Sequence, residues 1–94
     1  MFNYDNYPTE KIYDGTQSVI RFGELKLSVV RHSGSYGGKK GLYEIAVFGK
    51  SNLIELPGIT EDGDTVKGYL TKDDVDGILT KMYFVTGCEP VADV

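Results

Sequence analysis

The sequence predicts an α+β domain, with a mostly antiparallel sheet of four to five strands and one C-terminal helix packed on one face. Short β-rich runs separated by turn residues fill residues 17–70, and a run of helical periodicity follows at residues 71–87. A single helix covers one face of a sheet, and an antiparallel sheet tolerates a second face in water. With a length of 94 residues, residues 1–94 are expected to form one small domain.

Residues 1–15 are expected to form an aromatic N-terminal arm. Phenylalanine and tyrosine are mixed there with Asn, Asp, Pro and Gly, and neither the strand nor the helix period runs through the segment. Because an unpacked tail would hold fewer aromatic residues, we expect the arm to lie on the domain or on a neighbouring copy.

The sheet is predicted to start near Gln17 with a β-hairpin. Two β-rich runs, SVIRF and LKLSVV, flank Gly23-Glu24, and glycine at the first of two loop positions is typical of a type II′ turn. In the second run, apolar residues alternate with Lys26 and Ser28, which is the period of a half-buried strand.

Three further strands complete the predicted sheet. The run LYEIAVFG is almost continuously apolar and indicates a central strand, while LIEL indicates a short strand that a Pro-Gly pair ends. Asp62-Gly63 is a type I′ turn signal, and residues 65–70 form the last strand. The tail after Gly87 is expected to be irregular.

Residues 71–87 carry the local signals of a helix. Thr71 can cap the first turn, and Asp74 completes a capping box three residues later. Gly87 supplies the left-handed residue that commonly ends a helix. One apolar face is formed by side chains at helical spacing, namely Val75, Ile78, Leu79, Met82 and Tyr83.

Composition excludes several classes of protein. A single cysteine, Cys88, rules out an internal disulfide framework and a multi-cysteine zinc site. We expect no signal peptide and no membrane span, and therefore a cytoplasmic protein. We also expect no cofactor and no metal. Residues 1–51 carry seven Lys/Arg and five Asp/Glu, whereas residues 52–94 carry three and nine. This acidic balance argues against a general nucleic-acid binder, whose footprint is strongly basic.

The glycine-rich segment 33–41, SGSYGGKKG, is the first candidate site. Two lysines and neighbouring basic residues make it locally cationic, so it is a candidate anion or nucleic-acid contact formed by Arg31, His32, Tyr36, Lys39 and Lys40. It matches neither phosphate-loop pattern and no helix follows it. The alternative is a flexible hairpin tip, because glycine loses the most backbone entropy on ordering.

An acidic stretch near the helix start is the second candidate. It suits a protein partner with a basic surface and is formed by Glu61, Asp62, Asp64, Asp73 and Asp76. No register satisfies a calcium loop. The alternative is a solvated face, since a helix N-terminus favours acids without any partner.

The outer side of the helix is the third candidate. Gly77 and Phe84 lie about 180–200° from Val75 and so point away from the apolar stripe. The alternative is that Phe84 packs under the arm or the C-terminal tail. Catalysis is not expected, because the only histidine, His32, and Cys88 have no visible reason to meet.

These features favour a non-catalytic protein–protein interaction module, such as a small inhibitor or modulator of a larger host protein of the kind that phages and mobile elements encode. The acidic stretch and the Gly77–Phe84 side of the helix would contact the partner. One alternative is a nucleotide- or nucleic-acid-binding protein that uses the basic hairpin 31–41. The other is a self-assembling structural subunit that exchanges its aromatic arm between copies.

Overall fold

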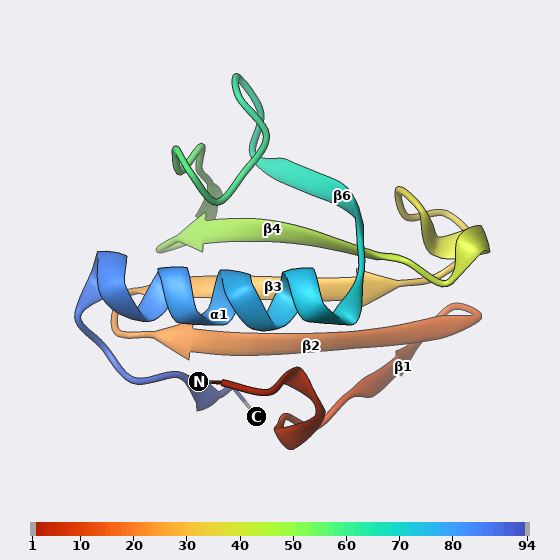
Figure 1. Ribbon diagram of the computed structural model, residues 1–94, viewed down its shortest axis with the longest axis horizontal. Coiled ribbons are helices and arrows are strands. Elements are labelled where there is room, and N and C mark those ends of the chain that lie inside the picture. The colour runs from red at the N-terminus through yellow and green to blue at the C-terminus, as the bar shows by residue number, and fades with distance from the viewer. Residues whose placement is uncertain (1, 94) are drawn as a thin grey trace.

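A computed structural model describes residues 2–93, so the two ends of the expected domain, residues 1 and 94, lie outside the described residues. A seven-stranded antiparallel sheet forms one layer, and helix α1 (Lys72–Thr86) lies across it as the second (Figure 1). The strands are β1 (Glu10–Ile12), β2 (Gly15–Phe22), β3 (Leu25–Arg31), β4 (Tyr43–Gly49), β5 (Asn52–Leu53), β6 (Val66–Leu70) and β7 (Val91–Ala92). Strands β1 to β5 are neighbours in chain order, while β6 pairs with β4 and β7 pairs with β2. The α+β class is confirmed.

The sheet is larger than the predicted four to five strands. The additional strands lie in segments that were expected to be irregular, because β1 belongs to the arm and β7 to the tail. Both are antiparallel partners of the long strand β2. Strands of two or three residues are too short to show a period, so pairing with β2 was invisible in the sequence. The expected strand at LIEL is also wrong in extent, since β5 ends at Leu53.

The β2–β3 hairpin forms as predicted. Phe22 pairs with Leu25 across the two-residue turn, and Gly23 has φ +64° at the first turn position. A side chain at Gly23 would also collide with the Cys88 thiol, because an added Cβ would lie 2.7 Å from Sγ. The C-terminal tail therefore packs closely on this turn.

Helix α1 begins and ends where the local signals place it. The Thr71 hydroxyl accepts from the Asp74 N–H (3.1 Å), and the Asp74 carboxylate accepts from the Thr71 N–H (2.9 Å). Gly87 is left-handed, with φ +68°, and its N–H donates to the Tyr83 carbonyl (2.8 Å). The capping box and the glycine stop are both confirmed.

The core lies between α1 and one face of the sheet. The helix contributes Val75, Ile78, Leu79 and Met82, all buried. The fifth residue of the predicted stripe, Tyr83, is half-buried and meets the Phe2 ring edge-on, with centroids 5.5 Å apart. The sheet contributes buried side chains from its three longest strands, which are Ile20, Phe22, Leu27, Val29, Ile45 and Val47.

The N-terminal arm packs on its own domain. Tyr4, in a short 3-10 helix (η1, Tyr4–Asn6), is only 4% exposed. Its hydroxyl donates to Ser18 Oγ (2.8 Å), and its N–H donates to Asp76 Oδ1 (2.7 Å). Burial raises the pKa of the Tyr4 hydroxyl above its ordinary value. The arm thus ties β2 to the first half of α1.

The second face of the sheet has no helix over it within residues 2–93. Arg21 and Lys26, which are paired across β2 and β3, both reach the Asp93 carboxylate, at 3.5 and 2.9 Å. Such exposed pairs contribute little stability. The two-layer arrangement with one wet face matches the prediction.

The capping box gives the fold a dependence on acid pH. Hydrogen bonds from Thr71 hold the pKa of Asp74 below its ordinary value. A lowered folded-state pKa stabilises the fold above the unfolded pKa of about 4, and this contribution is lost as pH falls through the lower folded value. Asp74→Asn should therefore lower the free energy of unfolding at pH 7 by about 0.3–1 kcal/mol, because it removes a negative charge from the first turn of the helix.

Urea denaturation between pH 2 and pH 7 would measure this. Asp73→Asn is the matched control, because it removes the same charge from a side chain outside the capping box. We expect Asp74→Asn, but not Asp73→Asn, to flatten the loss of stability in acid. Equal slopes for the two variants would contradict the assignment.

Candidate functional site

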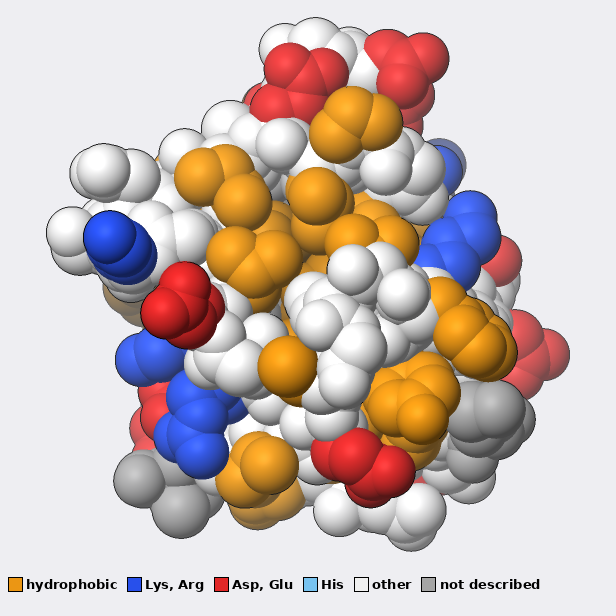
Figure 2. Space-filling view, turned by 90° about the vertical axis from the view of Figure 1, so that its left-hand side faces the viewer, with side chains coloured by type: hydrophobic (Ala, Val, Ile, Leu, Met, Phe, Trp, Pro, Cys, Tyr) orange, Lys and Arg blue, Asp and Glu red, His pale blue; other side chains and the backbone are white. Residues whose placement is uncertain are grey.

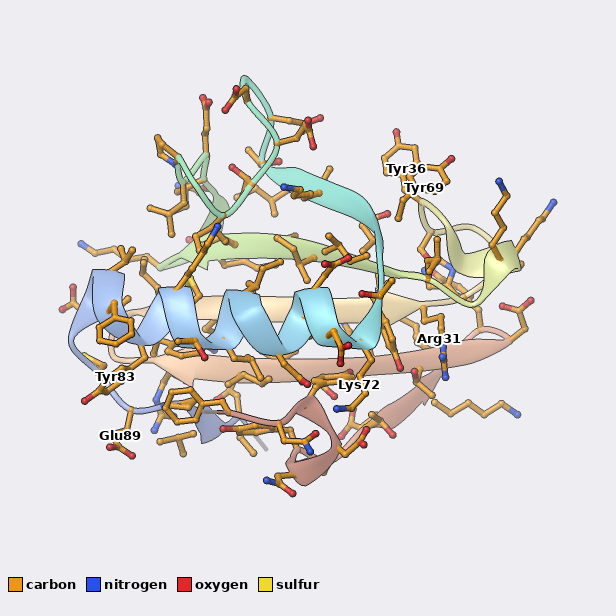
Figure 3. The ribbon with its side chains drawn as sticks, viewed as in Figure 1. Arg31, Tyr36, Tyr69, Lys72, Tyr83 and Glu89 are labelled. Atoms are coloured by element: carbon orange, nitrogen blue, oxygen red, sulfur yellow. The ribbon has the colours of Figure 1, made fainter. Side chains whose placement is uncertain are left out.

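Three exposed tyrosines gather at one end of the sheet. Tyr13 lies in the β1–β2 turn, Tyr36 in the β3–β4 loop and Tyr69 in β6, and their side chains are 78%, 59% and 60% exposed. The Tyr13 ring meets the His32 ring of the β3–β4 loop edge-on, with centroids 5.1 Å apart. Figure 3 shows Tyr36 and Tyr69 side by side above that loop. We call these three residues the tyrosine end.

The backbone brings Tyr36 and Tyr69 together. The Tyr69 N–H donates to the Tyr36 carbonyl (3.2 Å). Gly68 permits this approach, because a Cβ added there would lie 2.3 Å from the Cβ of Tyr36. The glycine is thus required where two distant segments touch.

Two of the three tyrosines occupy a conformation that bulky residues avoid. Tyr13 has φ +54° and Tyr69 has φ +57°. Left-handed backbone in a residue of this kind costs on the order of 1–3 kcal/mol and clusters at binding and active sites. Because the rings are exposed, core packing does not repay this cost. The strain is the strongest sign that this end has a role beyond folding.

The glycine-rich loop is held by hydrogen bonds of its own. Ser35 Oγ accepts from the His32 N–H (3.0 Å) and donates to the His32 carbonyl (2.8 Å). The Tyr36 N–H donates to Glu44 Oε1 (2.8 Å), and a 3-10 helix (η2, Gly38–Lys40) follows. A Cβ at Gly38 would lie 1.7 Å from the His32 carbonyl oxygen. These bonds and the close approach at Gly38 support the loop that carries the Tyr36 ring.

Basic side chains surround the glycine-rich loop. A hollow of about 760 Å³ is lined in part by Lys11, Arg31 and Lys39, together with His32 and the acidic residues Glu10 and Asp14. A smaller hollow of about 310 Å³ lies between Tyr36, Tyr69 and both loop lysines. Arg31 stacks over the Tyr43 ring, 4.7 Å from its centroid, and is labelled in Figure 3. The lysines lining the two hollows form no salt bridge among residues 2–93.

Two acidic side chains near the loop, Asp14 and Glu44, hold it through hydrogen bonds. Asp14 Oδ1 accepts from the Ser33 N–H (2.9 Å), and this bond holds the pKa of Asp14 below its ordinary value. Glu44 accepts from Tyr36 as described above. The structure brings together the residues of the predicted basic hairpin at this end of the sheet, namely Arg31, His32, Tyr36, Lys39 and Lys40.

The predicted acidic stretch divides into two separate groups. Glu61, Asp62 and Asp64 are exposed on the loop between β5 and β6, where Glu55 Oε2 accepts from the Gly63 N–H (2.7 Å). Asp73 lies at the start of α1, beyond the five residues of β6, which span roughly 16 Å. One continuous acidic face is not formed.

Asp76 serves the fold rather than a free surface. Its carboxylate accepts from the Tyr4 N–H (2.7 Å) and from Lys72 Nζ (3.0 Å). Lys72 also reaches Asp5 at 3.6 Å, and Figure 3 shows it between the helix and the arm. This residue of the predicted partner-binding set instead fastens the arm.

The outer side of α1 is open among the described residues. A Cβ added at Gly77 would meet nothing within 4 Å, and the Phe84 side chain is 68% exposed. Phe84 does not pack under the arm or tail; it meets Tyr83 edge-on with centroids 5.4 Å apart. Figure 2 shows the end of the molecule where α1 stops, with hydrophobic side chains gathered below acidic ones.

Cys88 and His32, the two residues considered for nucleophilic catalysis, lie at opposite ends of the sheet. Cys88 packs on the β2–β3 turn before β3, and His32 follows β3 directly. The seven residues of β3 separate them by roughly 20 Å.

In the part of the chain that the structure describes, no three His, Cys, Asp or Glu side chains are placed to hold a metal ion. No helix there has the length and apolar character to cross a membrane.

Sequence reasoning missed Tyr13 and Tyr69. Tyr69 was hidden in a predicted strand, although the preceding glycine signals a close backbone approach. Tyr13 was assigned to an arm without a site. No protein-family model, no curated protein and no solved structure matches this chain.

Two glycine substitutions test the geometry of the site. Gly68→Ala should lower the free energy of unfolding by about 1–3 kcal/mol, because its Cβ would press on Tyr36. Gly77→Ala should raise it by about 0.5–1 kcal/mol, because alanine favours the helix and finds open space. Urea denaturation of both variants measures the difference. Equal effects would mean that the close approach at Gly68 is not real.

Proposed function

We propose that this protein is a non-catalytic interaction module that binds a protein partner through the tyrosine end. The observation that carries the proposal is the exposure of Tyr13 and Tyr69 on strained, left-handed backbone. The left-handed backbone itself serves the two-residue turn at Tyr13 and the strand irregularity at Tyr69, but the fold does not require a bulky ring at either position, where glycine would be free of strain. A binding surface does gain, because the rings are held out in fixed positions before the partner arrives.

The composition of the tyrosine end suits protein recognition. Tyrosine offers a large amphipathic contact area at low cost in side-chain entropy, and it is enriched among the residues that dominate interfaces. The loop sequence SGSYGG sets Tyr36 among small residues, which leave its ring accessible to a partner. Lys39 and Lys40 flank this surface, which favours a partner with acidic groups at the rim.

This proposal moves the interaction surface away from the acidic residues. A partner with a basic surface would instead contact Glu61, Asp62 and Asp64, on the loop between β5 and β6. Those side chains are exposed, but no strain and no exposed ring accompanies them. A small module can inhibit or modulate a larger protein by covering part of its surface. We propose this role for the protein, and we propose a phage or a mobile element as its source.

A nucleotide or single-stranded nucleic acid is the second candidate ligand. The cation-lined hollow beside two exposed rings favours it, because such proteins combine base stacking with basic contacts to the backbone. The overall charge of −4 opposes it.

Affinity capture from cells of the source organism tests the protein-binding proposal. Immobilised wild-type protein should retain a partner that Tyr36→Ser/Tyr69→Gly fails to retain. Asp62→Lys/Asp64→Lys is the matched control, because it alters two exposed residues on the other loop. Retention by the tyrosine variant and loss by the acidic variant would overturn the proposed surface in favour of the acidic one.

Fluorescence anisotropy with labelled oligonucleotides and a labelled nucleotide separates the two ligand classes. If the ligand is a protein, both probes give flat titrations. Binding that falls steeply with salt and disappears in Lys39→Glu/Lys40→Glu would favour nucleic acid instead. Circular dichroism of each variant confirms that a loss of binding is not a loss of fold.

A further inference from the structure

The outer face of α1 carries a row of three residues, with an acid at one end, a glycine in the middle and a base at the other end. Asp73, Gly77 and Lys81 follow each other at intervals of four residues, so they lie in one row along the helix. All three are exposed. Among residues 2–93, no element lies in front of α1 in the view of Figure 1.

Gly77, at the middle of the row, has no packing role within its own chain. A Cβ added there would meet nothing within 4 Å, and its backbone is not left-handed. Glycine inside a helix lowers helix stability relative to alanine. What it does provide is bare backbone, which another helix can approach closely.

The charges on either side of Gly77 are opposite. Asp73 lies about 6 Å before it along the helix axis and Lys81 about 6 Å after it. Neither forms a salt bridge among the described residues, and Lys81 Nζ has only the Gly58 carbonyl at 3.3 Å. The row is therefore acidic at one end, open in the middle and basic at the other end.

The rows of two copies are complementary in charge when one copy is turned so that the two helices run in opposite directions. A two-fold axis through Gly77 makes two helices antiparallel, and it places Asp73 of each copy opposite Lys81 of the other. A two-fold interface uses the same patch on both subunits, so each favourable contact occurs twice. The exposed Phe84 ring then reaches towards the first turn of the opposite helix and covers apolar surface.

We propose that a second copy of this chain docks on the outer face of α1, with the helices antiparallel and crossing at Gly77. Asp73 and Lys81 form two reciprocal ion pairs, and Phe84 packs at each side of the crossing. This interface differs from the arm exchange considered from the sequence, because Tyr4 holds the arm on its own chain. It goes beyond the proposed function, since it rests on residues outside the tyrosine end.

A single helix face is smaller than a standard interface, so the dimer should be weak and depend on salt. Sedimentation velocity over a wide concentration range at low salt measures it. Wild-type protein should dimerise with rising concentration, while Asp73→Lys and Lys81→Asp should each weaken dimerisation at least tenfold. Asp73→Lys/Lys81→Asp should restore it, because exchanging both charges rebuilds both pairs. Asp62→Lys, on a loop outside the interface, should leave it unchanged.

Two further variants keep the test independent of charge. Gly77→Leu has room within its own chain, so it should stay folded and lose the dimer. Gly77→Cys in a Cys88→Ser background should form a disulfide-linked dimer on oxidation, while Asp62→Cys in that background should not.

Monomeric wild-type protein at all concentrations would overturn the proposal. So would single charge reversals that dimerise like wild type, or a double variant that does not recover.

Discussion

The rest of the structure depends on the burial of one helical stripe against one face of the sheet. Val75, Ile78, Leu79 and Met82 are the side chains that close the core, and a chain of this size has one such core to bury. The arm reinforces this contact, because Tyr4 joins Ser18 of β2 to Asp76 of α1. With its stripe buried, α1 presents only its outer row to solvent, and the sheet presents its ends and its second face.

The same contact shapes the tyrosine end. Helix α1 starts at its capping box directly after β6, so the chain must turn from strand to helix within a few residues. Tyr69 takes the left-handed conformation just before this turn, while Gly68 lets β6 touch the glycine-rich loop. The element that organises the core thus fixes one side of the proposed binding surface. The loop bonds of Ser35 and Glu44 fix the other side.

Features with local signals could be predicted from the sequence, and features made by distant contacts could not. The caps of α1, its buried stripe and the Gly23 turn are set by residues a few positions apart, and all are confirmed. Strands β1 and β7 exist only because β2 accepts them as partners. For the same reason Asp76 was placed on a partner surface although Tyr4, distant in sequence, occupies it. The basic residues of the loop were found, but their neighbour Tyr69 was not, because β6 meets the loop only in the folded chain.

We infer that the tyrosine end is maintained for binding and not for stability. The most direct measurement is the free energy of unfolding, by urea denaturation, of a triple variant carrying Tyr13→Gly, Tyr36→Ser and Tyr69→Gly. Glycine adopts the left-handed backbone without strain, which offsets the chain entropy it adds to the unfolded state. We expect the free energy of unfolding of this variant to lie within about 1 kcal/mol of the wild-type value or above it. A loss of more than about 3 kcal/mol, the scale of a core truncation, would show that these rings hold the fold together and would contradict this inference.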